Sequence, residues 1–452
     1  MNGGRQLGRV HVVGAGLAGL AAAVELAAGG HQVRLYEATG QAGGRCRSYF
    51  DAALGCRIDN GNHLVLSGNR DTLGYLGRIG SLDTIAGPAD AIFGFFDAAS
   101  GERWQLRPNP GAAPWWVLRA ARRVPGSHAT DYLEALKLRS AGAAATVAER
   151  LDRDRLLFRR LWEPLAVAAL NSGVEHASAR LFWHVLAETL GRGGAQCRPL
   201  LPCSGLSETF VEPALDTLRK ACAEVRFSTR LRALELTADR VTRLAFETET
   251  VTLGATDDLV LAVPATIAAR MVPELVVPDA FSPIVNAHFR CSAPPGAPLF
   301  IGIVGGTAQW VFRKRSVLSV TVSAADRIVD RSAAALQEIL WRDVAAAYRL
   351  PPVPVPAARI VKERRATFLA SPEQLRRRPA PVTRWSNLVL AGDYMATGLP
   401  ATIEGAIRSG LSAARIVTAG RRPEAAPLPK NVARPRLARP RDWKRQQRHQ
   451  YR

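Results

Sequence analysis

The stretch Val10-His11-Val12-Val13-Gly14-Ala15-Gly16-Leu17-Ala18-Gly19 decides the fold class of this chain. It predicts a short β-branched strand, a glycine turn and a helix over residues 17–26. A second strand, predicted over residues 32–36, ends at Glu37. Strand, glycine turn, helix, strand and terminal acid in this order predict an α/β protein with a Rossmann-like, dinucleotide-binding βαβ unit.

The glycines of this unit each have a physical task. Gly14 permits the tight turn, Gly16 lets the backbone approach a pyrophosphate, and Gly19 lets the helix pack closely on the sheet. The N–H groups at the start of the helix and its positive dipole end favour phosphates. We therefore expect the nucleotide to be bound by these glycines together with Ala15 and Ala18.

A second glycine pair follows the acid. Glu37 is followed by Ala38 and, after four further residues, by Gly43-Gly44-Arg45. Glu37 can accept hydrogen bonds from ribose hydroxyls, the glycine pair lets the backbone pass a cofactor closely, and Arg45 can pair with phosphate oxygens. The pattern E-x5-G-G-R resembles the flavin monoamine oxidase and phytoene desaturase superfamily, in which it lies along the FAD pyrophosphate. The resemblance implies that FAD is the cofactor, and no flavin-linking Cys or His is evident, so we expect it to be bound without a covalent link.

The far end of the chain carries a matching motif. A strand predicted over 387–391 runs into Gly392-Asp393, and a second helix opens within residues 399–406. In the superfamily the aspartate of this motif lies on the ribityl chain, and the helix N-terminus faces the flavin pyrimidine, where it stabilises negative charge. The resemblance therefore adds four cofactor-binding residues, Gly392, Asp393, Thr402 and Ile403.

The middle of the chain completes the predicted cofactor domain. We expect a helix over 207–225 and strands over 225–227, 231–236 and 259–264. In the superfamily the backbone at the position of Leu231 meets the adenine.

The predicted organisation is a discontinuous FAD-binding domain with a mixed α+β substrate domain inserted in it. Residues 1–75, 205–275 and 383–420 make up the first domain, and residues 76–204 and 276–382 make up the second. Residues 421–452 hold eleven Lys/Arg against two acids and predict a disordered basic tail.

Three strings narrow the resemblance to one branch of the superfamily. Three stretches together are similar to the hydroxysqualene dehydroxylases, a bacterial family of hopanoid and isoprenoid synthesis: Ile58-Asp59-Asn60-Gly61-Asn62-His63-Leu64-Val65-Leu66, residues 161–165 with 168–172, and residues 397–406. The likeness runs from about residue 9 to 420, with one departure at Ala166, where a cysteine is expected. It implies that reduced FAD removes the hydroxyl of hydroxysqualene, a C30 isoprenoid, to give squalene.

Gly61, Asn62 and His63 lie in a loop expected near the flavin and are predicted to bind the cofactor, and two roles stay open for His63. It can deliver a proton to the leaving hydroxyl as the catalytic residue, or it can merely hydrogen-bond the cofactor. Two acids have simpler roles. We expect Asp59 to be a turn residue and Glu404 to complement the dipole of the last helix.

Glu163 is a buried acid or, more simply, a charge at a helix N-terminus. The six cysteines form no CxxC pair and the eight histidines are scattered, so we predict no metal site and a reducing cytoplasm.

The net charge of +21 is an ambiguous signal, because 54 of the 60 basic residues are arginine, a bias typical of GC-rich bacterial genomes. No helix-turn-helix, zinc finger or RNP string is present, so no specific nucleic acid is predicted. No stretch of eighteen apolar residues exists, so we expect no spanning helix but peripheral contact at the inner face of the cell membrane. The segment 114–123, with Trp115, Trp116, Leu118 and three arginines, is either a helix that docks on anionic lipid or one that buries its tryptophans.

Two other functions share some of these features. A carotenoid desaturase or isomerase, or an amine oxidase, would carry the same cofactor motifs, although the loop from Tyr394 to Gly398 has a single aromatic residue and weakly disfavours the amine oxidase. A basic nucleic-acid or membrane adaptor that keeps only the fold is supported solely by the tail and the pI of about 10.8.

Overall fold

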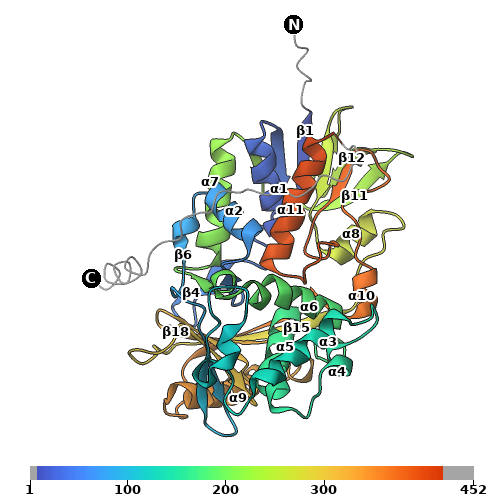
Figure 1. Cartoon of the computed structure of the whole chain (residues 1–452). Coiled ribbons are helices and arrows are strands. Elements are labelled where there is room, and N and C mark those ends of the chain that lie inside the picture. The colour runs from blue at the N-terminus through green and yellow to red at the C-terminus, as the bar shows by residue number, and fades with distance from the viewer. Residues whose placement is uncertain (1–7, 421–452) are drawn as a thin grey trace.

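A five-stranded parallel sheet forms the upper half of the protein (Figure 1). The computed structural model describes residues 8–420, and the tail predicted to be disordered lies outside them. The strand order is β10-β2-β1-β14-β20, and every neighbouring pair is parallel. The strands are β1 (Arg9–Val13), β2 (Gln32–Tyr36), β10 (Glu224–Arg226), β14 (Asp258–Leu261) and β20 (Leu388–Leu390).

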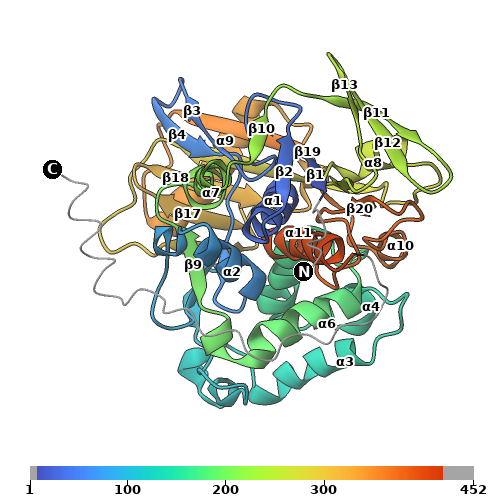
Figure 2. The ribbon, with the colours of Figure 1, turned by 90° about the horizontal axis from the view of Figure 1, so that it is seen from above.

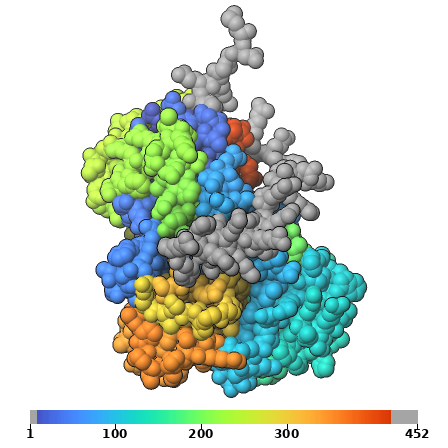
Figure 3. Space-filling model, turned by 90° about the vertical axis from the view of Figure 1, so that its left-hand side faces the viewer, coloured from blue at the N-terminus to red at the C-terminus, as the bar shows by residue number. Residues whose placement is uncertain are grey.

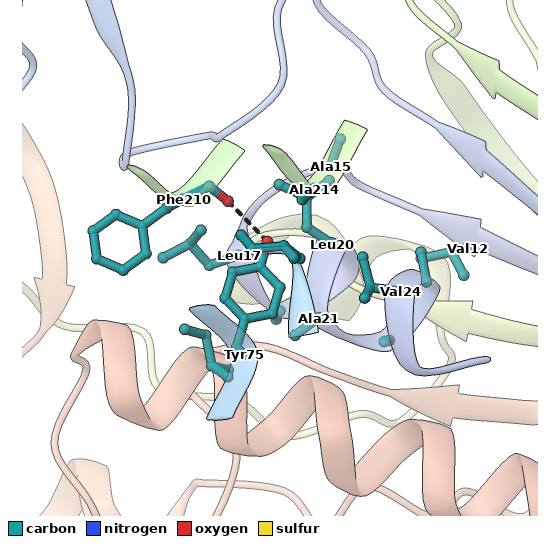
Figure 4. Packing of buried hydrophobic residues seen from close by; sticks show 14 of the residues in the cluster. Val12, Ala15, Leu17, Leu20, Ala21, Val24, Tyr75, Phe210 and Ala214 are labelled. Atoms are coloured by element: carbon teal, nitrogen blue, oxygen red, sulfur yellow. Dashed lines mark hydrogen bonds between the residues drawn. The ribbon is translucent and has the colours of Figure 1, made fainter. Parts of the chain in front are cut away.

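Both faces of this sheet are covered, as expected for a parallel sheet with apolar strands. Val12 and Val260 contribute to a core beneath four helices, α1 (Leu17–Ala28), α2 (Arg70–Arg78), α7 (Glu212–Lys220) and α11 (Ile403–Thr418). In this core the Tyr75 hydroxyl donates to the Phe210 carbonyl oxygen at 2.8 Å (Figure 4). The other face packs against α8 (Ala265–Met271) and an antiparallel sheet of β11 (Leu231–Leu236), β12 (Val241–Phe246) and β13 (Thr250–Thr252).

Helices α1 and α11, from opposite ends of the chain, lie side by side (Figures 1 and 2). Glycine makes this approach possible. A Cβ atom on Gly410 would lie 2.1 Å from the Ala18 carbonyl oxygen, and one on Gly19 would lie 1.8 Å from the Gly14 carbonyl oxygen. The first glycine thus permits helix to pack on helix, and the second permits the helix to pack on the turn that precedes it.

A seven-stranded mixed sheet, in the order β19-β15-β18-β17-β16-β7-β8, forms the lower half. Helix α9 (Ala333–Tyr348) covers one face, and the segment that contains α3 (Leu136–Arg139), α4 (Val147–Arg150), α5 (Glu163–Leu170) and α6 (Ala179–Glu188) covers the other. Figure 3 shows the cyan residues beside the yellow and orange residues of the later part of the chain. The strands of the seven-stranded sheet are β7 (Phe93–Asp97), β8 (Arg103–Leu106), β15 (Phe281–Phe289), β16 (Phe300–Val304), β17 (Trp310–Lys314), β18 (Val317–Val322) and β19 (Ala358–Phe368).

Two small sheets are formed by segments that link the upper and the lower half along the chain. One pairs β3 (Ser48–Asp51) with β4 (Cys56–Asp59), and the other joins β5 (Val65–Leu66), β9 (Pro199–Pro202) and β6 (Ile85–Ala86). No helix within residues 8–420 is long and apolar enough to cross a bilayer.

The predicted strands 32–36 and 231–236 are present with these bounds. The helix predicted over 207–225 is too long, because the observed helix ends earlier. The structure has a π-helical turn at Ser207–Val211, and α7 then ends at Lys220. The reason is local, because Cys222 adopts a left-handed φ of 56° and the Ala223 N–H donates to the Leu218 carbonyl, which closes the helix.

Candidate active site

Two glycine turns lie against each other at the N-terminus of α1. Gly16 and Gly43 form a parallel bridge, and the Gly43 N–H donates to the Ala15 carbonyl oxygen at 2.7 Å. Gly43 and Gly44 have φ values of 104° and 58°, which favour glycine. No side chain caps the helix, and a Cβ atom on Gly16 would meet no atom within 4 Å. The open space and uncapped amides fit a phosphate group at this point.

The acid predicted to bind ribose lies at the edge of this turn. Glu37 accepts hydrogen bonds from the backbone N–H groups of Ala15 and Thr39, each at 2.9 Å, and from the Thr39 hydroxyl. Its own carbonyl oxygen accepts from the Thr229 N–H at 2.8 Å, which places the start of β11 beside it. Leu231, at that start, is buried. The adenosine-binding residues predicted from the sequence therefore lie on adjoining segments, with Ala38 between Glu37 and Thr39.

The arginine of the second glycine motif meets the aspartate of the C-terminal motif. Arg45 Nη2 lies 2.7 Å from Asp393 Oδ2, although 348 positions separate the two residues. The Gly392 N–H donates to the Ser409 hydroxyl at 3.0 Å, and Thr402 caps α11 by accepting from the Gly405 N–H at 3.1 Å. The two halves of the predicted cofactor site are thus adjacent, and Thr402 and Ile403 open the helix that begins there.

The loop that carries His63 joins this arrangement from the opposite side. The Asn60 side-chain amide donates to the Arg45 carbonyl at 3.4 Å, and the Asn286 amide of β15 donates to the Asn60 carbonyl at 3.3 Å. The Asn62 amide donates to the Thr321 hydroxyl of β18 at 3.0 Å. The loop therefore lies between the glycine motif of the upper half and the sheet of the lower half.

Positive charge and burial set the ionisation of His63. Burial lowers its pKa to about 4, and the charges of Lys314 and Arg45 act in the same direction while Asp59 opposes them. The imidazole is therefore neutral at pH 7. Sequence reasoning did not find Lys314, because nothing in its own neighbourhood distinguishes it from a surface lysine.

The prediction that Asp59 is a turn residue is wrong. It is the last residue of β4, it is buried, and it pairs with Lys314. Its Oδ1 also accepts from the Ser48 hydroxyl at 2.6 Å and the Leu206 N–H at 2.9 Å. Burial alone would raise the pKa of Asp59, but the Lys314 ammonium and these hydrogen bonds hold it below its ordinary value.

Glu404 lies in the first turn of α11, as predicted, and it also caps a second helix. Its carboxylate accepts from the Asp71 N–H at 3.2 Å and from the Thr72 N–H at 2.8 Å, at the N-terminus of α2. Burial raises the pKa of Glu404. The contact is non-local, so the position of Glu404 in its own helix could not reveal it.

Glu163 lies in the first turn of α5, as predicted, and burial followed by the nearby Glu175 raises its pKa. The dipole argument is weaker than expected, because a π-helical turn at Phe158–Trp162 runs directly into α5. Ala166, the position where the related family led us to expect a cysteine, is fully buried in the core beneath the seven-stranded sheet.

An arginine that the sequence analysis missed supports the C-terminal loop. The Arg378 guanidinium donates to the carbonyl oxygens of Leu399 at 2.7 Å, Tyr394 at 3.3 Å and Asp393 at 3.4 Å, and it also contacts the Met395 carbonyl. Burial lowers the pKa of Arg378 to about 10. It is the third arginine of a run of three, and no feature of that run singles it out.

The segment 114–123 is neither of the two helices expected. It forms two 3₁₀ turns, at Trp115–Leu118 and Ala120–Arg122. Trp115 and Leu118 are 67% and 62% exposed, whereas Trp116 is buried and meets the Tyr132 ring edge-on, with ring centroids 5.1 Å apart. The short turns place adjacent tryptophans on different sides, which a helical wheel could not predict.

The chain matches one family of known proteins over most of its length. The family described as flavin containing amine oxidoreductase matches residues 17–418. The chain belongs to this family. The protein is an FAD-dependent oxidoreductase of the flavin containing amine oxidoreductase family.

Relatives narrow the position within the family. The chain is 46% identical to a hydroxysqualene dehydroxylase of Sinorhizobium fredii over 90% of this chain and 97% of that one. It is also 46% identical to one of Rhodopseudomonas palustris over 91% and 99% of the two chains. The predicted resemblance to this group is confirmed.

Solved structures support the fold. Cyclohexylamine oxidase of Brevibacterium oxydans has a TM-score of 0.67 at 16% identity, covering 91% of this chain and 99% of that one. Putrescine oxidase has a TM-score of 0.65 at 16% identity, with the same coverage. This member of the flavin containing amine oxidoreductase family therefore has the α/β fold that its sequence predicted.

Proposed function

We propose that this protein removes the hydroxyl group of hydroxysqualene to give squalene. The observation that carries the proposal is the 46% identity to hydroxysqualene dehydroxylases over nearly the whole length of both chains. In the reaction the carbon–oxygen bond breaks, a carbon–hydrogen bond forms, and the oxygen leaves as water, which consumes two electrons and two protons. Bound FAD in its reduced form supplies the two electrons.

The residues of the chain would bind and orient this cofactor. We propose that the glycine turns and the N-terminus of α1 hold the pyrophosphate, that Glu37 holds the ribose, and that Arg45 and Asp393 hold the segment leading to the flavin. The uncapped amides of α1 and the open space over Gly16 support this assignment. The FAD-binding domain would then comprise residues 1–75, 205–275 and 383–420, of which residues 1–7 lie outside the described part of the chain, and residues 76–204 and 276–382 would bind the substrate.

His63 is the proposed proton donor to the leaving hydroxyl. Its support is its place between Arg45 and the lower sheet, on a loop fixed by Asn60 and Asn62. Protonating a hydroxyl turns it into a better leaving group, and a protonated imidazole with a pKa of about 4 gives up its proton more readily than an ordinary imidazolium.

An anaerobic assay tests the proposed function. The flavin-reduced protein is mixed with hydroxysqualene, and squalene is measured by mass spectrometry. One equivalent of squalene per reduced flavin is the expected result, with the visible spectrum returning to that of oxidised FAD. No squalene, or oxidation of amines instead, would contradict the proposal. Acid precipitation of the same protein should release free FAD into the supernatant, because no covalent link is expected.

We further propose that the protein contacts anionic lipid without spanning the bilayer. Four exposed apolar side chains support a docking patch, which we define as Trp115, Leu118, Leu133 and Leu136, each more than half exposed. Arg119 lies beside them in sequence and is exposed. A C30 alcohol partitions into bilayers, so contact with lipid would spare the substrate a passage through water.

A further inference from the structure

Side chains of the seven-stranded sheet alternate between two environments. On β15, Val285, Ala287 and Phe289 belong to the core beneath α9. Because successive strand residues point to opposite faces, Asn286 and His288 lie on the face turned away from α9. The same alternation on β18 places Leu318, Val320 and Val322 beneath α9, and Ser319 and Thr321 on the other face.

The result is a buried polar stripe, which we define as Asn286, His288, Ser319 and Thr321. Strand pairing extends this face into apolar surroundings. Trp310 of β17 lies opposite Thr321, and Phe312 lies opposite Ser319. Directly opposed residues of an antiparallel pair lie on the same face, so the polar stripe is bordered by aromatic rings.

A chain of hydrogen bonds fixes how the stripe orients the loop above it. The Asn60 carbonyl can only accept, so it determines that Asn286 turns its amide nitrogen toward it, at 3.3 Å. Asn286 Oδ1 then accepts from the Thr321 hydroxyl at 2.7 Å. Having donated its only hydrogen, Thr321 must accept from the Asn62 amide nitrogen, at 3.0 Å. The orientation of the Asn62 amide therefore follows from a backbone carbonyl two residues earlier.

This orientation leaves one atom without a partner. Asn62 Oδ1 is buried and has no hydrogen-bond donor among residues 8–420. A buried carbonyl oxygen without a donor is unfavourable, so Asn62 Oδ1 is free to accept a hydrogen bond from a ligand.

We propose that Asn62 Oδ1 accepts the hydrogen bond of the substrate hydroxyl. The inference rests on the proposed function, which supplies an alcohol. The loop has two sides: Asn60 turns its amide to Arg45, on the side of the predicted cofactor residues, whereas Asn62 turns its amide to Thr321 and the polar stripe. His63, the proposed proton donor, is the next residue. Asn62 is thus a specificity residue that holds the hydroxyl oxygen beside His63.

Binding measurements test this role separately from catalysis. The FAD-loaded, oxidised protein is titrated with hydroxysqualene and with squalene, and binding is followed by the change in flavin absorbance. The parent should bind the alcohol at least tenfold more tightly than the hydrocarbon. Asn62→Leu, which keeps the size of the side chain and removes the acceptor, should abolish this preference while the Kd for squalene stays within about twofold.

Two variants of Thr321 test the orientation without altering Asn62. Thr321→Ser keeps the hydroxyl and should keep the preference for the alcohol. Thr321→Val removes it, frees the Asn62 amide to turn, and should reduce the preference several-fold. These variants also answer the question if Asn62→Leu fails to hold FAD.

The outcomes separate the inference from the function it rests on. If the parent converts the alcohol and Asn62→Leu keeps the preference, the inference is wrong and the function stands. If Asn62→Leu instead lowers the affinity for FAD with the preference intact, the acceptor serves the cofactor and the inference is again wrong. If the parent neither prefers nor converts the alcohol, both fail.

Discussion

Arg378 shows at the scale of one residue how a loop without regular structure is held at a site. Its guanidinium contacts four carbonyl oxygens of the Asp393–Leu399 loop and lies over the Phe368 ring, 5.0 Å from its centroid. Backbone carbonyls of a loop lack the partners that a helix or a sheet would provide. Arginine suits this task because its planar guanidinium carries five N–H donors in a fixed geometry.

We expect Arg378→Lys to lower the affinity for FAD at least tenfold. An ammonium group cannot reach all four carbonyls, and a buried acceptor left unpaired costs about 1–3 kcal/mol. The measurement is the Kd for FAD by fluorescence quenching, with Arg376→Lys, an exposed arginine of α10 (Pro372–Arg376), as the matched control. Equal FAD affinity in the two variants would mean that the loop is held by other contacts.

The lowered pKa of His63 predicts a particular pH dependence. If protonated His63 donates the proton, the protonated fraction, and hence kcat/KM, should rise about tenfold per unit as pH falls from 7 to 5, because its pKa is about 4. His63→Gln should slow the reaction about a hundredfold at pH 5 and flatten the profile while FAD stays bound. A profile of the same slope in the variant would remove His63 from the proton transfer.

At the scale of elements, the decisive contact is that between α1 and α11. It has no side chain at its centre, because Gly410 places backbone directly against the Ala18 carbonyl. Glu404 of α11 then caps α2, so the last helix fixes two earlier ones. The cofactor motifs at the two ends of the chain are aligned by these contacts.

Gly410→Ala should destabilise the protein although alanine is the better helix former. The added Cβ would lie 2.1 Å from a backbone oxygen, and such overpacking costs about 1–3 kcal/mol. Gly74→Ala is the control, because Gly74 is an exposed residue inside α2 with no atom within 4 Å of its added Cβ. It should stabilise by about 0.5–1 kcal/mol. We expect the urea midpoint of unfolding to fall in Gly410→Ala and to rise in Gly74→Ala, each relative to the parent. A raised midpoint in Gly410→Ala would contradict the packing argument.

Two features belong to the scale of the whole molecule: histidines with lowered pKa values and apolar side chains exposed on the surface. Within residues 8–420, loss of contact with water lowers the pKa values of His11, His63 and His288 to about 4, 4 and 3. The outer surface carries the docking patch in the segment between β8 and α4. Both features concern the entire protein, the first through the pH dependence of unfolding and the second through the proposed contact with lipid.

The buried histidines should make the folded state less stable in mild acid. Their folded pKa values lie below the ordinary 6.5, so the unfolded chain binds protons first and stability falls as pH drops below 6.5. Each contributes a slope of about 1.4 kcal/mol per pH unit between 6.5 and 5. His11→Asn should reduce the measured slope by about that amount, whereas His128→Asn, at an exposed position, should not. Identical slopes for both variants would contradict the lowered pKa.

The docking patch predicts salt-sensitive binding to vesicles. Trp115→Ser with Leu133→Ser should weaken sedimentation with phosphatidylglycerol vesicles at least fivefold, and high salt should weaken that of the parent. Phe50→Ser is the matched control, because Phe50 is as exposed as Trp115 but lies in β3. Trp116 is left unchanged because it is buried. Unaltered binding of the double variant would place the contact elsewhere.

Local signals explain what could be predicted from sequence. The βαβ unit and the strand before Gly392-Asp393 have a strict periodicity and glycines at the turns. The fold and the FAD motifs could therefore be predicted from the sequence. Residues whose role depends on a distant partner were not, as Lys314, Arg378 and Glu404 show. The prediction for residues 114–123 was wrong for a related reason. This segment has no regular period, and packing decides which of two adjacent residues in a 3₁₀ turn is exposed.

The pairing of α1 with α11 has a consequence for synthesis on the ribosome. Helix α1 ends at Ala28 and α11 begins at Ile403, so the surface of α1 that α11 covers emerges long before its partner. At about 5–20 residues per second, the delay is roughly 20 to 75 seconds. Asp393 is also made late, so a nascent chain cannot complete the FAD site until translation is almost finished. Truncated chains should therefore be bound by chaperones rather than by flavin.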